Sequence, residues 1–62
     1  MFKLSFNTEN DAFQDGNKEE EIKRILQKVI KQVEEIPTTQ SYDNYIYDIN
    51  SNKIGQWELI EE

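Results

Sequence analysis

The feature that most constrains this chain is one apolar stripe with helical spacing between residues 18 and 35. Six apolar side chains recur at intervals of three and four residues, the spacing that places them on one face of an α-helix. A chain of 62 residues has room for one such helix and one small partner layer. The stripe therefore predicts an amphipathic helix over 18–35, with an inner face of Ile22, Ile25, Leu26, Val29, Ile30 and Val33.

Both ends of this helix carry their own signals. Asn17 is a capping residue type, and Glu20 stands three residues later, where a capping box places its acidic partner. Glu19, Glu20 and Glu21 crowd the first turn, where the helix dipole favours negative charge. Pro37 removes a backbone N–H and restricts the residue before it, so the helix is predicted to end by residue 35.

Alternation of apolar and polar residues predicts three strands. Residues 1–7 place Phe2, Leu4 and Phe6 on one face of a half-buried strand. Residues 45–60 alternate on both sides of an Asn-Ser-Asn-Lys turn, which predicts a hairpin.

The predicted fold is a single α+β domain over residues 1–62, in the order β-α-β-β, with one amphipathic helix packed on a three-stranded sheet. The strand order stays open. The first strand either runs parallel to the second through a right-handed crossover or lies antiparallel beside the third. Phe13, alone among polar residues, is predicted to plug the end of the core, and Gly55 to mark a bulge near the start of the last strand.

The side chains that most enzymes and metal sites need are missing. There is no Cys and no His, which excludes disulfides, thiolate chemistry and an imidazole base. Two glycines form no phosphate-binding loop. Residues 48–52 (DINSN) open like a calcium loop, but Lys53 and Leu59 stand where a glycine and a bidentate glutamate belong, so a side-chain-bonded hairpin turn is the better interpretation. We expect no enzymatic activity, no catalytic residues, no metal and no cofactor.

Thirteen acidic residues against seven basic ones give a net charge of −6. This excess argues against direct binding to nucleic acid and to anionic membranes, because both select clustered Lys and Arg. It favours a partner protein with a basic surface. No apolar run is long enough to span a bilayer, and residues 1–7 turn polar too early for a signal peptide, so a cytoplasmic protein is expected.

Two groups of side chains are candidates for contacting a partner. The aromatic residues near the hairpin either fill the core or form a surface shared with a partner or a second copy. The acidic groups either solvate the domain or form a negative docking surface. The predicted partner-binding residues are Glu19, Glu20, Glu21, Tyr42, Tyr45, Tyr47, Trp57 and Glu58.

Residues 1–10 (MFKLSFNTEN) and 48–57 (DINSNKIGQW), with a helix between them, resemble short phage and prophage proteins of low-GC Gram-positive bacteria. Such proteins commonly carry Asn-Gly-Asn in the hairpin, where this chain has Ser51, so a different turn geometry is expected. Some small acidic phage proteins block host defence systems. The resemblance implies such a role, with no catalytic residues to carry over.

We interpret the sequence as a small, acidic, non-enzymatic binding protein, encoded by a phage. It is expected to inhibit a basic, nucleic-acid-acting defence protein in the cytoplasm of the host cell by occupying its surface. The alternative is a homodimeric structural or regulatory module whose sheets pair through open faces or edges, because a thin core leaves apolar residues on both strand faces.

Overall fold

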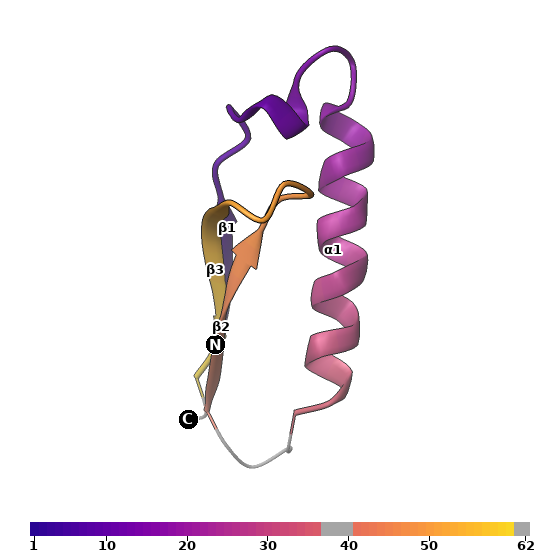
Figure 1. Ribbon diagram of the computed structural model, residues 1–62. Helices are drawn as coiled ribbons and strands as arrows, with labels where there is room; N and C mark the ends of the chain where they lie inside the picture. Colours follow the sequence, from indigo (N-terminus) through magenta and orange to yellow (C-terminus); the bar gives the residue numbers. More distant parts are fainter. Residues whose placement is uncertain (37–40, 61–62) are drawn as a thin grey trace.

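A computed structural model describes residues 1–36 and 41–60 and has one helix packed against one sheet (Figure 1). The predicted α+β class and the β-α-β-β order are confirmed. Pro37, predicted to end the helix, and the acidic pair Glu61 and Glu62 lie outside the described residues. The elements are β1 (Phe2–Phe6), the 3-10 helix η1 (Asp11–Phe13), α1 (Lys18–Glu34), β2 (Tyr42–Tyr47) and β3 (Lys53–Leu59).

The sheet has the order β1-β3-β2 with both pairings antiparallel. Because α1 runs back along the sheet, β1 and β2 point the same way, and β3 lies between them in the opposite direction (Figure 1). Met1 and Ile60 each donate a backbone N–H to the other's carbonyl, both at 2.8 Å. The first and second strands are therefore parallel in direction but not neighbours, and the antiparallel placement of the first strand beside the third is confirmed.

The hairpin is shifted toward the N-terminus relative to the predicted 45–60. β2 already begins at Tyr42, and it leaves the sheet after Tyr47 because Asp48 belongs to the turn. The Asp48 N–H donates to the Asn52 carbonyl at 2.9 Å, and the Asp48 carbonyl accepts from the Ser51 N–H at 3.0 Å. Ser51 has a φ of 68°, the left-handed conformation that glycine adopts at least cost.

The inner face of the sheet is built around Trp57, on the central strand. Trp57 lies opposite Leu4 of β1 and has no exposed surface. Its ring centroid is 5.7 Å from that of Phe2 and 5.6 Å from that of Tyr42, one from each edge strand. The indole is thus enclosed by its own sheet on two sides and by α1 above.

The rest of the core joins α1 to both ends of the sheet. Ile25 and Val29 of α1 pack with Ile46 of β2 and with Phe13 of η1. Phe13 is 2% exposed and its ring stacks on Phe6, with centroids 6.2 Å apart, so the prediction that it plugs the core end is confirmed. Because Ile46 faces inward, the tyrosines on either side of it face outward.

Gly55 lies against the backbone of β1, opposite Phe6. A Cβ atom at Gly55 would be 2.0 Å from the backbone oxygen of Ser5, so only glycine fits. The β2–β3 register also shifts beside it: Ile46 pairs with Gly55, whereas Tyr47 pairs with Lys53. The bulge predicted near Gly55 is therefore present.

The predicted capping box is wrong. Asn17 has helical dihedrals (φ −93°, ψ 0°) and makes no side-chain cap bond, whereas a capping residue needs an extended backbone. The chain enters the helix through two left-handed residues, Asp15 (φ 58°) and Gly16 (φ 81°). Asn17 still holds the N-cap position, since its carbonyl accepts the Glu21 N–H at 2.9 Å, but its side chain does not cap the helix.

Candidate protein-interaction site

The apolar stripe of α1 is rotated away from the sheet. Ile25 and Val29 are buried, whereas Leu26 and Ile30 of the same stripe are 41% and 56% exposed. At 3.6 residues per turn, Leu26 and Ile30 lie about 100° and 140° around the axis from Ile25. The sheet thus covers one flank of the stripe and leaves the other in solvent.

Two polar residues of α1 share the sheet-facing side with Ile25. Glu21 and Gln32 precede and follow Ile25 by four and seven residues, which places all three on one helical face. Gln32 accepts the indole N–H of Trp57 at 2.8 Å. Because a buried N–H needs an acceptor, this bond fixes which side of α1 faces the central strand.

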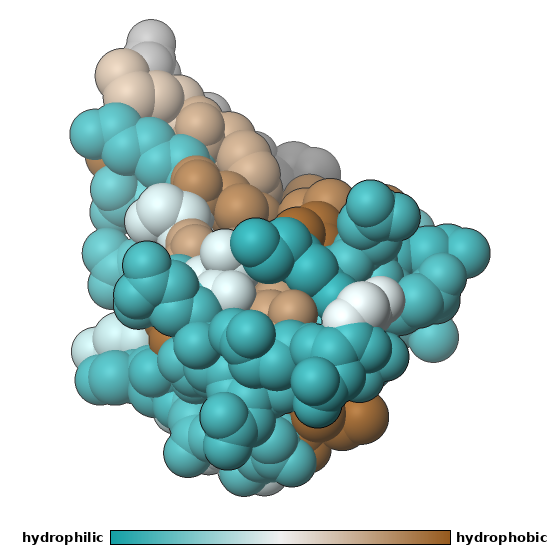
Figure 2. Space-filling view, turned by 90° about the horizontal axis from the view of Figure 1, so that it is seen from above, coloured by the Kyte–Doolittle hydropathy of each residue, from teal (hydrophilic) through white to brown (hydrophobic). Residues whose placement is uncertain are grey.

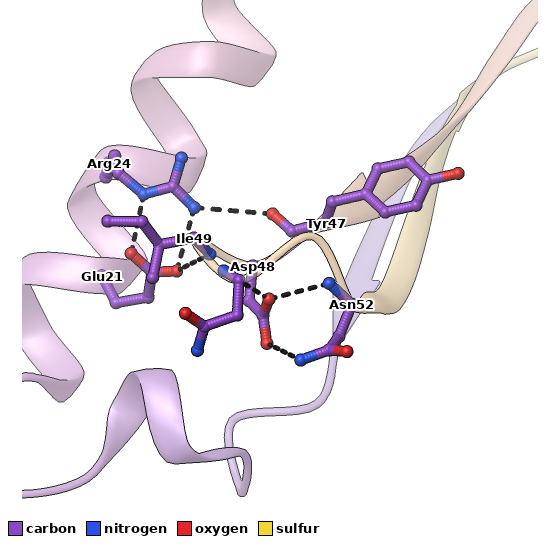
Figure 3. A network of polar contacts seen from close by, with 7 residues as sticks. Glu21, Arg24, Tyr47, Asp48, Ile49 and Asn52 are labelled. Atoms are coloured by element: carbon purple, nitrogen blue, oxygen red, sulfur yellow. Dashed lines mark hydrogen bonds and ion pairs between the residues drawn. The ribbon is translucent and has the colours of Figure 1, made fainter.

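Glu21 connects the first turn of α1 to the hairpin turn (Figure 3). Arg24 donates from Nε to Glu21 Oε1 at 2.7 Å and from Nη2 to Oε2 at 2.9 Å, and the Ile49 N–H donates to Oε2 at 2.8 Å. The hydrogen bonds from Arg24 lower the pKa of Glu21 below its ordinary value of 4.5, against the opposing effect of burial. Glu21 is only 5% exposed, so its assignment as a partner-binding residue is wrong.

Asp48 organises the hairpin turn in the same way (Figure 3). Its Oδ1 accepts the backbone N–H groups of Asn50 and Asn52, both at 2.9 Å. Its Oδ2 accepts the side-chain amides of Asn10 at 3.0 Å and Asn52 at 3.2 Å. The bond from Asn10 is the main reason that the pKa of Asp48 lies below its ordinary value. This confirms a side-chain-bonded turn at the partial calcium motif.

These two buried carboxylates are not suited to act as general acids. All four of their oxygens accept at least one hydrogen bond from the protein, and both pKa values are lowered, so both groups are ionised at neutral pH. A general acid needs the opposite shift. Within residues 1–36 and 41–60, no group of three or more acidic, His or Cys side chains is placed to hold a metal ion.

The uncovered face of the sheet carries three of the predicted partner-binding residues. Tyr45 and Tyr47 are 51% and 43% exposed there, and Glu58 lies on the same face of β3. Charges on this face are balanced, since Asp43 and Glu58 share it with Lys3 and Lys53. The Lys53 Nζ lies 4.3 Å from the centre of the Tyr45 ring.

The other two aromatic candidates face α1 instead. Trp57 is completely buried, so its assignment to a partner surface is wrong. Tyr42 stacks on Trp57 at the margin of the inner face and remains 41% exposed. The sequence pattern could not show that Tyr42 faces α1, because it placed the start of the strand at residue 45 and left Tyr42 in a loop.

Negative charge is concentrated at the end of the molecule where α1 begins. Figure 2 looks onto this end and shows a mostly hydrophilic surface. We call it the acidic end. Ile49, 64% exposed, lies beside it, because its N–H bonds Glu21. Its exposed carboxylates are Glu9, Asp11, Asp15, Glu19 and Glu20, against the single basic residue Lys18 between positions 9 and 20.

A second exposed surface was not predicted. Beside the edge strand β1, Phe2 is 48% exposed and faces the exposed flank of α1 across an apolar groove. Sequence reasoning missed it because the hydrogen bonds that turn Glu21 and Gln32 toward the sheet are long-range. We call this surface the apolar flank, and its lining is Phe2, Leu4, Leu26, Val29, Ile30 and Val33, with Glu34 at one end.

No family model, curated protein or solved structure matches this chain. Within the described part of the chain, no helix combines the length and apolar character that crossing a bilayer requires.

Proposed function

We propose that this protein acts without catalysis, by docking its acidic end on a basic surface of another protein. The observation that carries this proposal is the segregation of charge. Five exposed carboxylates face one lysine between residues 9 and 20, while the open sheet face balances two carboxylates with two lysines. A surface of one sign steers a partner of the opposite sign and suppresses wrong encounters.

Apolar residues beside the acidic end can form the apolar centre of an interface, which charged residues alone cannot. Ile49 is 64% exposed and is held at the start of α1 by its N–H bond to Glu21. Tyr47 is 43% exposed, and its carbonyl accepts a 3.5 Å bond from Arg24 Nη2. An apolar centre with a charged rim is the usual composition of a protein interface.

The partner class that fits is a protein whose basic surface otherwise binds nucleic acid, since such proteins cluster Lys and Arg on one face. The resemblance to phage proteins narrows this class to a defence protein in the cytoplasm of the host cell. Occupying the basic surface would compete with the nucleic acid, which is inhibition without chemistry.

The test is capture from a lysate of a low-GC Gram-positive bacterium by two variants that remove equal charge from different places. Glu19 and Glu20 change to Gln in one variant, and Glu35 and Asp43, both exposed, change to Gln and Asn in the other. We expect the first to lose a basic partner that the second and the natural protein retain. Capture should also weaken as salt rises.

Equal loss in the two variants would mean that net charge, rather than the acidic end, determines binding. Capture that ignores salt, or a partner without a basic surface, would contradict the proposal. A competition experiment with nucleic acid on the captured protein then tests inhibition, because an occupied basic surface must release its nucleic acid.

A further inference from the structure

The apolar flank lies beside a strand edge with unused backbone groups. Among the residues that the structure describes, β3 alone pairs with β1. Met1 exchanges both backbone bonds with Ile60, and Asn7 donates to the Ile54 carbonyl at 2.9 Å. In an antiparallel ladder these bonded pairs alternate, so the N–H and C=O groups of Phe2, Leu4 and Phe6 point outward.

The opposite edge of the sheet is closed by its own residues. By the same alternation, the outward N–H groups of β2 belong to Asp43, Tyr45 and Tyr47. The Tyr45 N–H is already bonded to the side-chain oxygen of Asn44 at 2.9 Å, and the extra residue Ile54 of β3 shifts the register of this pairing after Ile46. Such devices protect an edge strand from pairing, and β1 keeps a regular five-residue register instead.

We propose that β1 and the apolar flank bind a second copy of this chain. The two copies of β1 pair antiparallel about a two-fold axis, which joins two three-stranded sheets into one of six strands. Both copies of α1 then lie on the same face of the joined sheet, with their exposed flanks toward each other. Phe2, Leu26 and Ile30 leave solvent in this arrangement.

The sequence of β1 favours one register for its pairing with β1 of the second copy. With the axis at Leu4, Phe2 lies opposite Phe6 of the second copy, and Lys3 lies opposite Ser5. The three outward-facing residues of each strand then form hydrogen-bonded pairs. A register centred on Lys3 would set two lysines directly opposite each other, which destabilises a sheet.

Charge complementarity on α1 fits a two-fold axis of the same kind. The axis makes the two helices antiparallel, so residues equally spaced about its crossing point meet. Lys23 and Glu34 are exposed and lie about 20° and 40° around the helix from Ile30. With the crossing point near residue 28, Leu26 meets Ile30 of the other copy, and Lys23 lies within side-chain reach of Glu34 of the other copy, twice by symmetry.

The accessible surface of the chain is also large for its mass. It is 4752 Å², whereas a folded monomer of this mass exposes about 4,200 Å². Stable dimers bury roughly 800 Å² on each partner, which one edge strand and one helix flank together can supply.

Sedimentation equilibrium from low micromolar to millimolar concentration tests the pairing. We expect the natural chain to reach a mass of twice 7.4 kDa, and Ile30→Glu to stay at 7.4 kDa at all concentrations. Ile49→Glu is the matched control, because Ile49 is also an exposed isoleucine (64%) but lies at the hairpin turn, away from the apolar flank. This variant should still dimerise. Circular dichroism verifies that each variant is folded.

A charge exchange tests the orientation of the helices. Lys23→Glu and Glu34→Lys should each raise the dimer dissociation constant about fivefold, since each replaces two attractive contacts by two repulsive ones. The double variant should restore the natural value. A chain that remains monomeric, a dimer that Ile30→Glu leaves intact, or a double variant weaker than both single ones would overturn the proposal. None of these results bears on the acidic end, so the two proposals fail separately.

Discussion

The two edges of the sheet differ in how they are joined to α1: over the described residues, the β2 edge is hydrogen-bonded to the helix, whereas the β1 edge is not. On the β2 side, Glu21, Arg24 and Ile49 tie the helix to the hairpin turn, and Asn44 bonds the outward N–H of Tyr45. On the β1 side, the strand edge presents backbone groups that pair with no other strand of residues 1–36 and 41–60, beside exposed apolar side chains of α1.

The difference shows how polar contacts set the orientation of an amphipathic helix. The buried indole N–H of Trp57 needs an acceptor, which Gln32 supplies, and the buried carboxylate of Glu21 needs donors, of which the Ile49 N–H is one. The helix turns these polar residues toward the sheet, and part of its apolar stripe moves into solvent as a result. The hydrogen bonds of Glu21 and Gln32 are therefore the reason that Leu26 and Ile30 are exposed on the β1 side.

The largest effect is expected at Gly55, because its replacement should separate β1 from the sheet and so remove the β1 edge. Gly55→Ala sets a Cβ 2.0 Å from the Ser5 oxygen, so β1 must separate from β3. We expect a loss of about 3 kcal/mol or more in the free energy of unfolding, measured by urea denaturation. Gln56→Ala, on the open face, is the control and should change it by less than about 0.5 kcal/mol.

The next largest effect is expected on the β2 side. Glu21→Gln removes the charge that accepts two bonds from Arg24 and one from Ile49, and should cost about 2 kcal/mol. Glu20→Gln makes the same chemical change at an exposed position and should be nearly neutral. Equal costs for the two variants would show that the Glu21 contacts do not stabilise the fold.

Acid should weaken the β2 side specifically. The pKa values of Glu21 and Asp48 are lowered in the folded state, so their stabilisation is complete above their ordinary values of 4.5 and 3.8. It is lost as the pH falls through the lower, folded-state values. Urea midpoints measured from pH 7 to strongly acidic pH should therefore decline below about pH 4.5, and decline less steeply in Glu21→Gln.

A smaller effect is expected where the orientation of α1 is fixed. Gln32→Leu leaves the buried indole N–H of Trp57 without its acceptor and should cost about 1–2 kcal/mol. Trp57→Phe alone leaves the Gln32 oxygen unpaired. In the double variant both polar partners are absent, so its cost should be smaller than the sum of the two single costs, which a double-mutant cycle measures.

The smallest effect in stability is expected at the β2 edge. Asn44→Ala removes the acceptor of the Tyr45 N–H and should cost about 0.5 kcal/mol. It should also open this edge, so that sedimentation detects assemblies larger than the dimer. A variant that remains at the same mass as the natural chain would show that Asn44 does not protect the edge.

Much of the fold was predictable because it rests on local periodicity. The spacing of Ile25 and Val29 predicted the helix, alternation predicted the first strand, and the lone Phe13 predicted a core plug. The strand order was not predictable, because alternation identifies a strand but not which neighbours it pairs with, and β3 pairs with both β1 and β2. The N-cap position at Asn17 was predicted correctly, but its side-chain bond is absent, because the left-handed Asp15 and Gly16 lead into an N-cap with helical dihedrals.

The candidate surfaces were less predictable than the fold. Glu19 and Glu20 are exposed as predicted, whereas Glu21, next in sequence, is buried by contacts from a segment 28 residues away. A stripe of apolar residues gives the width of a helical face but not its rotation. That rotation is set by two long-range hydrogen bonds, which the sequence does not reveal.

The central claim is that the β1 edge is open in one chain and covered by another. Amide hydrogen exchange measured by NMR at two protein concentrations tests it residue by residue. We predict that the amides of Phe2, Leu4 and Phe6 exchange quickly in dilute solution and slowly in concentrated solution, while those of Asp43 and Tyr47 do not change. Exchange rates at β1 that are independent of concentration, or protection that increases at β2 instead, would contradict the account.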